Sequence, residues 1–186
     1  MQIIAISGSL RKKSFNTALI NNAIYLASNN CNIELATLEN IPLYNGDEEE
    51  KYGVPEPVEK IKKKIKTADA LLISTPEYNN SIPGVLKNAL DWLTRPPADI
   101  PEVFGGKVVG LFGATIGNMG TLNAQTAWLP IFRTLSMRPW FGKKLFLSKA
   151  KEKFDDQGLL TDQHTKEKLQ EYIAEFIQFI KNPSGL

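Results

Sequence analysis

Three short runs of consecutive apolar residues constrain the fold of this chain more than any other feature of its sequence. They span residues 3–6, 70–73 and 108–112, and each is followed by a polar loop and then by apolar residues at helical spacing. A continuously apolar run of this length is typical of a strand that is buried on both faces of a parallel sheet. The sequence therefore predicts strands that alternate with helices, as in an α/β domain.

Two weaker strands complete the predicted order. Residues 33–38 alternate between apolar and polar as an edge strand does, and residues 145–147 give a brief last strand. Helices are predicted at about 18–27, 58–68, 85–93 and 122–135, with a final one capped near residues 161–162, and the polar stretch 40–57 is predicted as a surface loop. This order fits a flavodoxin-like three-layer sandwich with a five-stranded parallel sheet of order 2-1-3-4-5, and it also fits a small Rossmann domain.

Composition narrows the class of protein. The 186 residues suit a single domain, 1–186, and the net charge of +2 from 22 basic and 20 acidic residues is too balanced to indicate nucleic-acid binding. A single cysteine excludes an internal disulfide, and a single histidine argues against a His-based catalytic triad or a multi-His metal site. With neither a signal peptide nor a membrane-length apolar stretch, we expect a cytoplasmic protein that does not bind membranes.

The loop at residues 7–17 joins the first strand to the first helix and is rich in polar side chains. Its sequence, Ser-Gly-Ser-Leu-Arg-Lys-Lys-Ser-Phe-Asn-Thr, offers hydroxyls and positive charge at a helix N-terminus. The unpaired first-turn N–H groups and the helix dipole both favour an anion there, so the loop indicates a phosphate site. The alternative is that Ser14 or Asn16 simply caps the helix.

Two further loops have unusual composition. Residues 75–84 combine two prolines with a tyrosine and two asparagines, and residues 113–120 contain three glycines that allow a ligand to approach the main chain. In a 2-1-3-4-5 sheet these loops and the phosphate loop follow adjacent strands, so all three should meet at one edge. Such a site suits an aromatic heterocycle that carries a phosphate. The P-loop and dinucleotide fingerprints are missing, which favours a mononucleotide.

The chain resembles the NADPH-dependent FMN reductase family, which is flavodoxin-like and includes quinone, chromate and azo-dye reductases. The resemblance rests on two motifs: Gly8-Ser9-Leu10-Arg11-x-x-Ser14-x-Asn16 and Thr75-Pro76-Glu77-Tyr78-Asn79-x-Ser81-x-Pro83-Gly84-x-Leu86-Lys87-Asn88-Ala89-x-Asp91-Trp92. It implies that FMN and NADPH are the cofactors. Hydride would pass from the nicotinamide to FMN and then to a quinone, free flavin, azo compound or chromate-like oxyanion, without a catalytic side chain or a metal.

The resemblance also implies a set of FMN-binding residues. The phosphate would be held by Ser9, Arg11, Ser14, Asn16 and Thr17. The ring would be lined by Pro76, Glu77, Tyr78 and Asn79, with Thr115 and Gly117 on its other side. The loop 113–121 departs from the Arg-rich or Gly-Gly-rich pattern of other members.

The family further implies a homodimer or homotetramer. The helix that begins near Pro83 commonly packs against a partner subunit, and Leu86, Leu90 and Trp92 would either make that contact or belong to the core. Two other functions stay open at this point: an FMN electron carrier of the flavodoxin type, and a non-enzymatic mononucleotide-binding module. Glu77 is either a catalytic acid or, as we expect, a structural hydrogen-bond acceptor.

Overall fold

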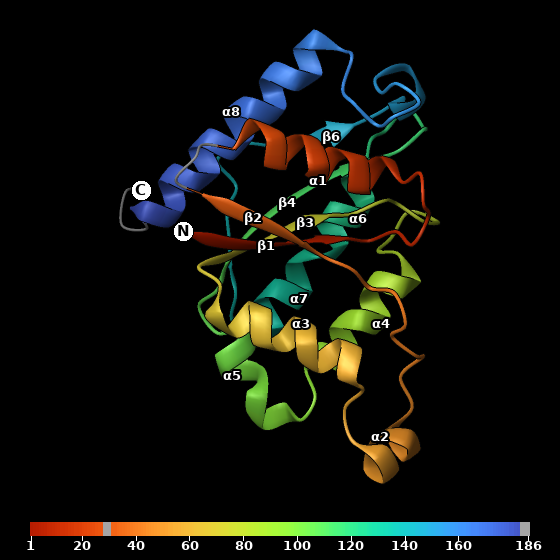
Figure 1. Cartoon of the computed structure of the whole chain (residues 1–186), viewed down its shortest axis with the longest axis vertical. Helices are drawn as coiled ribbons and strands as arrows, with labels where there is room; N and C mark the ends of the chain where they lie inside the picture. The colour runs from red at the N-terminus through yellow and green to blue at the C-terminus, as the bar shows by residue number, and fades with distance from the viewer. Residues whose placement is uncertain (28–30, 183–186) are drawn as a thin grey trace.

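A parallel sheet lies at the centre of the computed structural model, which describes residues 1–27 and 31–182 (Figure 1). Its main strands are β1 (Gln2–Ser7), β2 (Asn32–Ala36), β3 (Ala70–Ser74) and β4 (Val108–Ala114). Two short strands, β5 (Arg138–Pro139) and β6 (Phe146–Leu147), both pair with β4. The order is β2-β1-β3-β4-β5 with β6 also beside β4, so the flavodoxin-like α/β fold is confirmed.

The predicted number of strands was wrong, because the sheet has six strands within residues 1–27 and 31–182 and not five. The predicted last strand at 145–147 corresponds to β6, which pairs with Gly113 and Ala114 at the end of β4. β5 was missed, and it pairs with Val108 and Val109 at the start of β4. Two residues, one of them a proline, give no periodic signal in a sequence.

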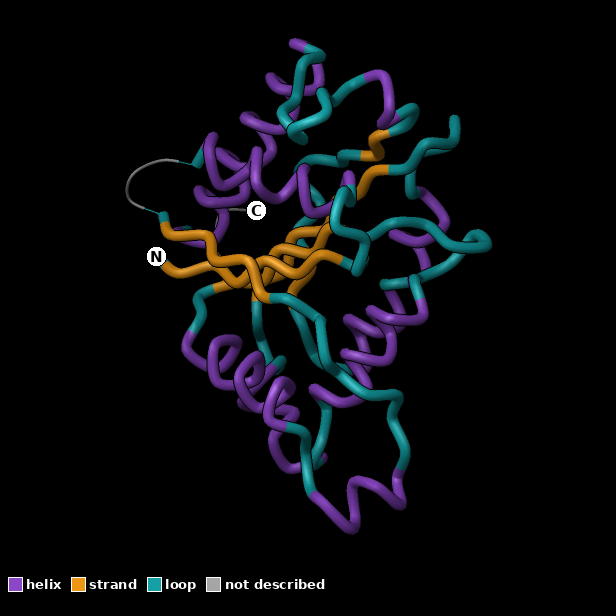
Figure 2. Tube along the Cα trace, turned by 45° about the vertical axis from the view of Figure 1, so that its right-hand side comes forward, coloured by secondary structure: helices purple, strands orange, loops and turns teal. Residues whose placement is uncertain are grey.

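Helices cover both faces of the sheet (Figure 2). α1 (Phe15–Leu26) and α8 (Gln163–Lys181) pack on one face, against side chains that include Ile3, Ala5 and Leu72. The opposite face is covered by α3 (Glu56–Thr67), α4 (Gly84–Leu93), α5 (Ile100–Val103) and α7 (Leu129–Thr134), which pack on the alternate strand residues. Successive strand residues thus enter different cores, and this explains the continuous apolar runs.

The predicted surface loop 40–57 contains a helix, α2 (Gly46–Tyr52), so that expectation was wrong in part. Asn45 caps this helix by accepting a hydrogen bond from Asp47 N (3.0 Å), and three acidic residues occupy its first turn. None of its residues is buried, so the sequence has no apolar stripe there. Arg95 holds α2 to the body of the protein, because its Nε lies 2.8 Å from a carboxylate oxygen of Glu49.

The single helix predicted at 122–135 is divided at Trp128 into α6 (Leu122–Ala127) and α7. Pro130 is at the second position of α7, where it cannot donate the N–H that would continue α6. At the last helix, Asp162 is the cap, as expected, and accepts from Thr165 N at 2.9 Å. The remaining elements are the 3₁₀ turns η1 (Pro97–Asp99) and η2 (Ala150–Glu152). Within the described ranges, no helix has both the length and the apolar character needed to cross a membrane.

Candidate functional site

The loops after β1, β3 and β4 meet at the carboxyl edge of the sheet, as predicted. β3 lies between β1 and β4, with Ser74 paired to Ser7 on one side and to Phe112 on the other. Main-chain hydrogen bonds continue this pairing past the strands, from Gly8 N to Ser74 O (2.8 Å) and from Thr75 N to Phe112 O (2.9 Å). The three loops therefore begin from one rigid, hydrogen-bonded base.

The side chain of Asn16 links the three loops through hydrogen bonds. Its side chain is 3% exposed, and its Nδ2 donates to Ala114 O at 2.9 Å. Its Oδ1 accepts from Ala114 N and from Ser74 Oγ, each at 2.9 Å. The side chain thus ties the start of α1 to the ends of β3 and β4, and its hydrogen-bonding groups face protein atoms.

Ser14 caps α1, so the capping alternative is confirmed for this residue. Its Oγ accepts from Asn16 N (3.2 Å) and Thr17 N (3.3 Å), and its side chain is buried. Thr17 Oγ1 in turn donates to Ser7 Oγ at 2.9 Å. The hydroxyl groups of Ser14 and Thr17 are therefore held in place by hydrogen bonds at the N-terminus of α1. The helix dipole favours an anion at this position.

Arg11 is one of three consecutive positive residues in the loop before α1, together with Lys12 and Lys13. Its side chain is exposed, and its main-chain N donates to Ser9 Oγ at 3.3 Å. Within residues 1–27 and 31–182, no carboxylate forms an ion pair with its guanidinium. An unpaired guanidinium beside ordered hydroxyls is suited to bind a phosphate group.

The loop after β3 contains a tight hairpin. Tyr78 and Ser81 exchange two main-chain hydrogen bonds (3.1 and 3.0 Å) around Asn79 and Asn80, whose φ angles are 50° and 59°. Positive φ at both central residues is the geometry of a type I′ turn, which asparagine tolerates. The turn presents the side chain of Tyr78, 44% exposed, at the sheet edge.

Glu77 makes a hydrogen bond to the start of α6. Its Oε2 accepts a hydrogen bond from Ala124 N at 3.0 Å. Ala124 lies in the first turn of α6, where N–H groups lack partners within the helix. Glu77 thereby fastens the hairpin loop to α6, and Pro76 beside it is buried.

The loop after β4 is held by main-chain hydrogen bonds to residues 147–150. Thr115 N donates to Leu147 O (2.9 Å), and Thr115 O accepts from Ala150 N (3.0 Å). Gly117 O accepts from Lys149 N at 3.0 Å. This support was missed in the sequence, because residues 147–150 are distant along the chain and carry no motif.

Gly113, near the end of β4, has no room for a side chain. A Cβ at this position would lie 2.0 Å from Thr75 O and 2.5 Å from Thr121 Oγ1. The glycine therefore allows β3 and β4 to remain close where the loops leave the sheet.

Together the three loops present ordered hydroxyls and a guanidinium at one end, and an aromatic hairpin and a glycine-containing loop at the other. This is the donor set for a planar heterocycle with a phosphate, and flavin mononucleotide fits it. All eleven residues that the resemblance implied belong to these loops or to the start of α1. Among the described residues, no group of three or more His, Cys, Asp or Glu side chains is arranged to hold a metal.

Comparisons with known proteins agree with this chemistry. The sequence model of the NADPH-dependent FMN reductase family matches residues 1–152. An NAD(P)H-dependent FMN reductase of Pseudomonas aeruginosa is 39% identical over 185 residues, with 100% of this chain and 98% of the relative covered. A 2-hydroxy-1,4-benzoquinone reductase of a Burkholderia species is 32% identical over 182 residues, with 98% and 97% covered.

A solved structure is also similar over the full length. FerB, a flavoenzyme NAD(P)H:(acceptor) oxidoreductase from Paracoccus denitrificans, has a TM-score of 0.85 and 30% identity, with 97% of each chain covered. The match extends beyond residue 152 and so includes α8. On the family match, the full-length relatives and the three-loop site, this chain belongs to the NADPH-dependent FMN reductase family.

Proposed function

We propose that this protein is an FMN-dependent oxidoreductase that takes a hydride from NAD(P)H and passes electrons to a quinone or a free flavin. Reductases of this kind are named among its full-length relatives. The observation that carries the proposal is the meeting of the phosphate loop, the hairpin loop and the glycine-containing loop at one edge of the sheet. Azo compounds and chromate-like oxyanions are further acceptors to be screened.

The residues divide into those that contact FMN and those that support the contact. Ser9, Arg11 and Thr17 would bind the phosphate, while Ser14 and Asn16 would support the loop through their hydrogen bonds to protein atoms. Residues 76–79 and residues 115–117 would hold the ring. FMN, when bound, supplies the redox chemistry of the reaction.

The chain's own part in the reaction is binding and electrostatics. The Arg11 guanidinium offsets the charge of the phosphate, and the helix dipole of α1 adds to this effect. The hairpin at residues 78–81 and the hydrogen bond of Glu77 hold the ring-binding loop in one conformation. Preorganised main-chain groups of this kind stabilise charge without a titrating side chain.

An absorbance spectrum tests the proposal. The purified protein, saturated with FMN, is mixed with NADPH under argon, and the flavin bands should bleach within seconds and return on addition of a quinone. Bands that persist with NADPH but bleach with a chemical reductant would indicate an electron carrier instead. If the protein fails to retain FMN at all, a different mononucleotide-binding function is favoured.

Arg11→Ala provides a sharper test of the phosphate site. Loss of a charge-assisted contact should weaken FMN binding by roughly tenfold or more. Arg133, an exposed arginine on α7, is the matched control, and Arg133→Ala should bind FMN as the unaltered protein does. Fluorescence titration with FMN measures both, and equal affinities would contradict the proposed role of Arg11.

We also propose that the enzyme is cytoplasmic and forms a homodimer or homotetramer. The exposed apolar side chains of Ile116 and Met119 beside the site support an association surface. The three residues of α4 considered for this contact, Leu86, Leu90 and Trp92, lie instead in the core of the chain itself. Light scattering on the FMN-loaded protein measures the mass, and a value near 20.7 kDa would exclude the oligomer.

A further inference from the structure

A groove of about 330 Å³ borders the phosphate loop on the side of β2. One wall comes from the phosphate loop and the start of α1 and includes Ser9, Arg11 and Thr17, for which a role is proposed above. The facing wall is formed by residues 35–39, at the carboxyl end of β2 and just beyond it, and it has no part in the proposed binding of FMN. The volume is at the lower end of the range for small-molecule sites.

The strand order determines in which direction a ligand at the phosphate loop can extend. The carboxyl ends of the strands lie side by side in the order β4, β3, β1, β2. The flavin ring is proposed at the loops after β3 and β4, and its phosphate at the loop after β1. The groove between the ends of β1 and β2, where Ile6 pairs with Ala36, is the next position in this order. A group joined to the phosphate can therefore extend into the groove, away from the ring.

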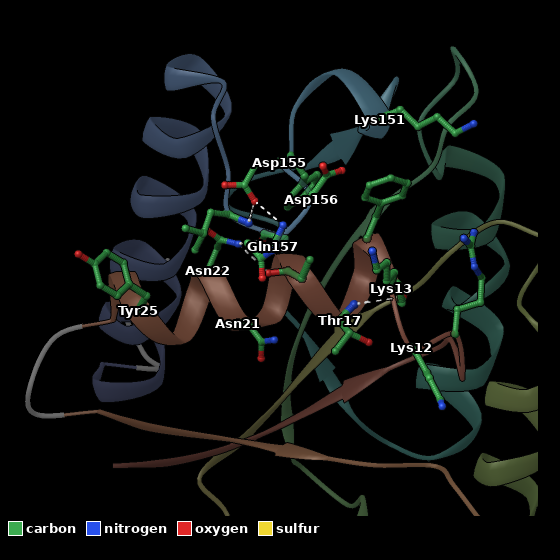
Figure 3. A pocket seen from close by; sticks show the side chains of 17 residues that line it. Lys12, Lys13, Thr17, Asn21, Asn22, Tyr25, Lys151, Asp155, Asp156 and Gln157 are labelled. Atoms are coloured by element: carbon green, nitrogen blue, oxygen red, sulfur yellow. Dashed lines mark hydrogen bonds between the residues drawn. The ribbon is translucent and has the colours of Figure 1, made fainter.

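A larger groove, of about 780 Å³, also adjoins the phosphate loop and lies between α1 and residues 151–159 (Figure 3). Its lining includes the carboxylates of Asp155 and Asp156, which disfavour a second phosphate. Lys12 lines both grooves, but its side chain points away from Lys151 and from the two aspartates (Figure 3). The charge of Lys12 is therefore better placed for the groove beside β2.

Charges of opposite sign lie on the two walls of the groove beside β2. Arg11 and Lys12 are exposed on one wall, and Glu39 is exposed on the other. In the part of the chain that the structure describes, none of the three forms an ion pair. The two cations suit a diphosphate, whereas the carboxylate can accept hydrogen bonds from hydroxyl groups such as those of a ribose. In dinucleotide-binding domains, an acidic residue that follows the phosphate-binding turn contacts the ribose in this way.

The wall beyond β2 is held in place by contacts within the chain. Glu39 N donates a hydrogen bond to Thr37 Oγ1 at 3.2 Å, and Leu38 between them is buried in the core. The apolar part of the lining comes from Leu35, which is half-buried, and from Leu10, which is 50% exposed. Apolar side chains of this kind can contact a planar base. The groove therefore offers cationic, acidic and apolar groups before any ligand enters it.

We propose that this protein also binds flavin adenine dinucleotide (FAD) in place of FMN, with the adenylate part in the groove beside β2. The inference rests on the proposed function, because the FMN part of FAD occupies the site proposed for FMN. Arg11 and Lys12 bind the second phosphate, and Glu39 accepts hydrogen bonds from the ribose hydroxyls. The glycine fingerprint of dinucleotide-binding domains is missing from the phosphate loop, so this use of the groove leaves no motif in the sequence.

Fluorescence titration of the flavin-free protein with FAD and with FMN tests the groove. The unaltered protein should bind FAD at least as tightly as FMN, because the adenylate adds contacts. Glu39→Ala should bind FAD roughly tenfold more weakly and FMN as before, since only FAD carries the adenosine ribose. Glu48→Ala, which changes an exposed glutamate of α2, is the matched control and should leave both affinities unchanged.

Two results of this titration would overturn the proposal. One is an affinity of the unaltered protein for FAD that is roughly tenfold or more below its affinity for FMN. The other is an effect of Glu39→Ala that is the same for both flavins, or that is missing for both, because the carboxylate would then have no contact with the adenylate.

Steady-state kinetics test the other source of an adenosine diphosphate group, which is the nicotinamide nucleotide. With FMN bound, kcat/KM of Glu39→Ala for NADH should equal that of the unaltered protein. If this value falls while the affinity for FAD does not, the groove binds the nicotinamide nucleotide and the proposal is wrong. If FMN binds and is reduced but FAD does not bind, this inference fails and the proposed function stands. If neither flavin binds, the proposed function fails and this inference fails with it.

Discussion

Replacement of Asn16 by alanine should destabilise the protein severely, although the side chain is small and polar. The change leaves three buried groups without their partners: the N–H and C=O of Ala114 and the hydroxyl of Ser74. An unsatisfied buried donor or acceptor costs about 1–3 kcal/mol, so the lower end of that range puts the loss at about 3 kcal/mol. That is a large fraction of the stability of an ordinary domain, which is about 5–15 kcal/mol.

Urea unfolding of the FMN-free protein measures this loss, with the free energy of unfolding obtained by linear extrapolation. Asn21→Ala is the matched control on the same helix, because Asn21 is exposed, and its effect should be within about 0.5 kcal/mol. Ser74→Ala removes one of the three hydrogen bonds and should cost about 1 kcal/mol.

Two results would refute the reasoning about Asn16. One is a free energy of unfolding for Asn16→Ala that is equal, within error, to that of Asn21→Ala. The other is a loss that appears only when FMN is bound, because it would make Asn16 a contact of the cofactor and not a support of the loops.

Three other changes test different parts of the structure. Gly113→Ala should destabilise the protein by more than about 3 kcal/mol, because the added Cβ would overlap Thr75 O. The control is Gly84→Ala, which should be tolerated because its Cβ meets no atom within 4 Å. Thermal unfolding compares the two variants. Glu77→Gln keeps an oxygen that accepts the hydrogen bond from the start of α6, so the dependence of kcat on pH should not change. If the acidic limb of the kcat profile disappears in this variant, Glu77 takes part in proton transfer. Hydrogen bonds from Thr165 and Lys153 lower the pKa of Asp162 to about 2. The contribution of Asp162 to stability is therefore present above the pKa of an unfolded aspartate and is lost as the pH falls toward 2. Asp162→Asn should therefore melt below the unaltered protein at pH 6, and a difference that persists at pH 2 would exclude this cause.

The sequence predicted the sheet well because burial on both faces leaves a strong pattern. Residues 70–73 are apolar without interruption, and β3 is buried along its entire length. The helix α2 was missed although Asn45 and the acidic residues after it are a typical helix start, because an exposed helix shows no apolar periodicity.

The meeting of the three loops at one edge of the sheet was predicted from the sequence, and the hydrogen bonds that support these loops were not. Motifs along the chain identify the three loops, and the strand order brings them together. The hydrogen bonds of Asn16 to Ala114, 98 residues away, depend on tertiary packing that no local pattern records. The same holds for the groove between α1 and residues 151–159, since its two walls lie more than a hundred residues apart in the sequence.

The division of β4 between two neighbours has a consequence for how the protein opens locally. The amide of Gly113 donates to Leu145 O and that of Thr115 to Leu147 O, whereas Val108 and Val109 pair with β5. Amide hydrogen exchange at the two ends of β4 should therefore report separate opening events, because regions with different partners can unfold independently. The pairing of residues 145–147 with β4 can open while β1, β3 and the start of β4 stay paired. The loop after β4 then becomes more mobile, whereas the phosphate loop keeps its support from the sheet.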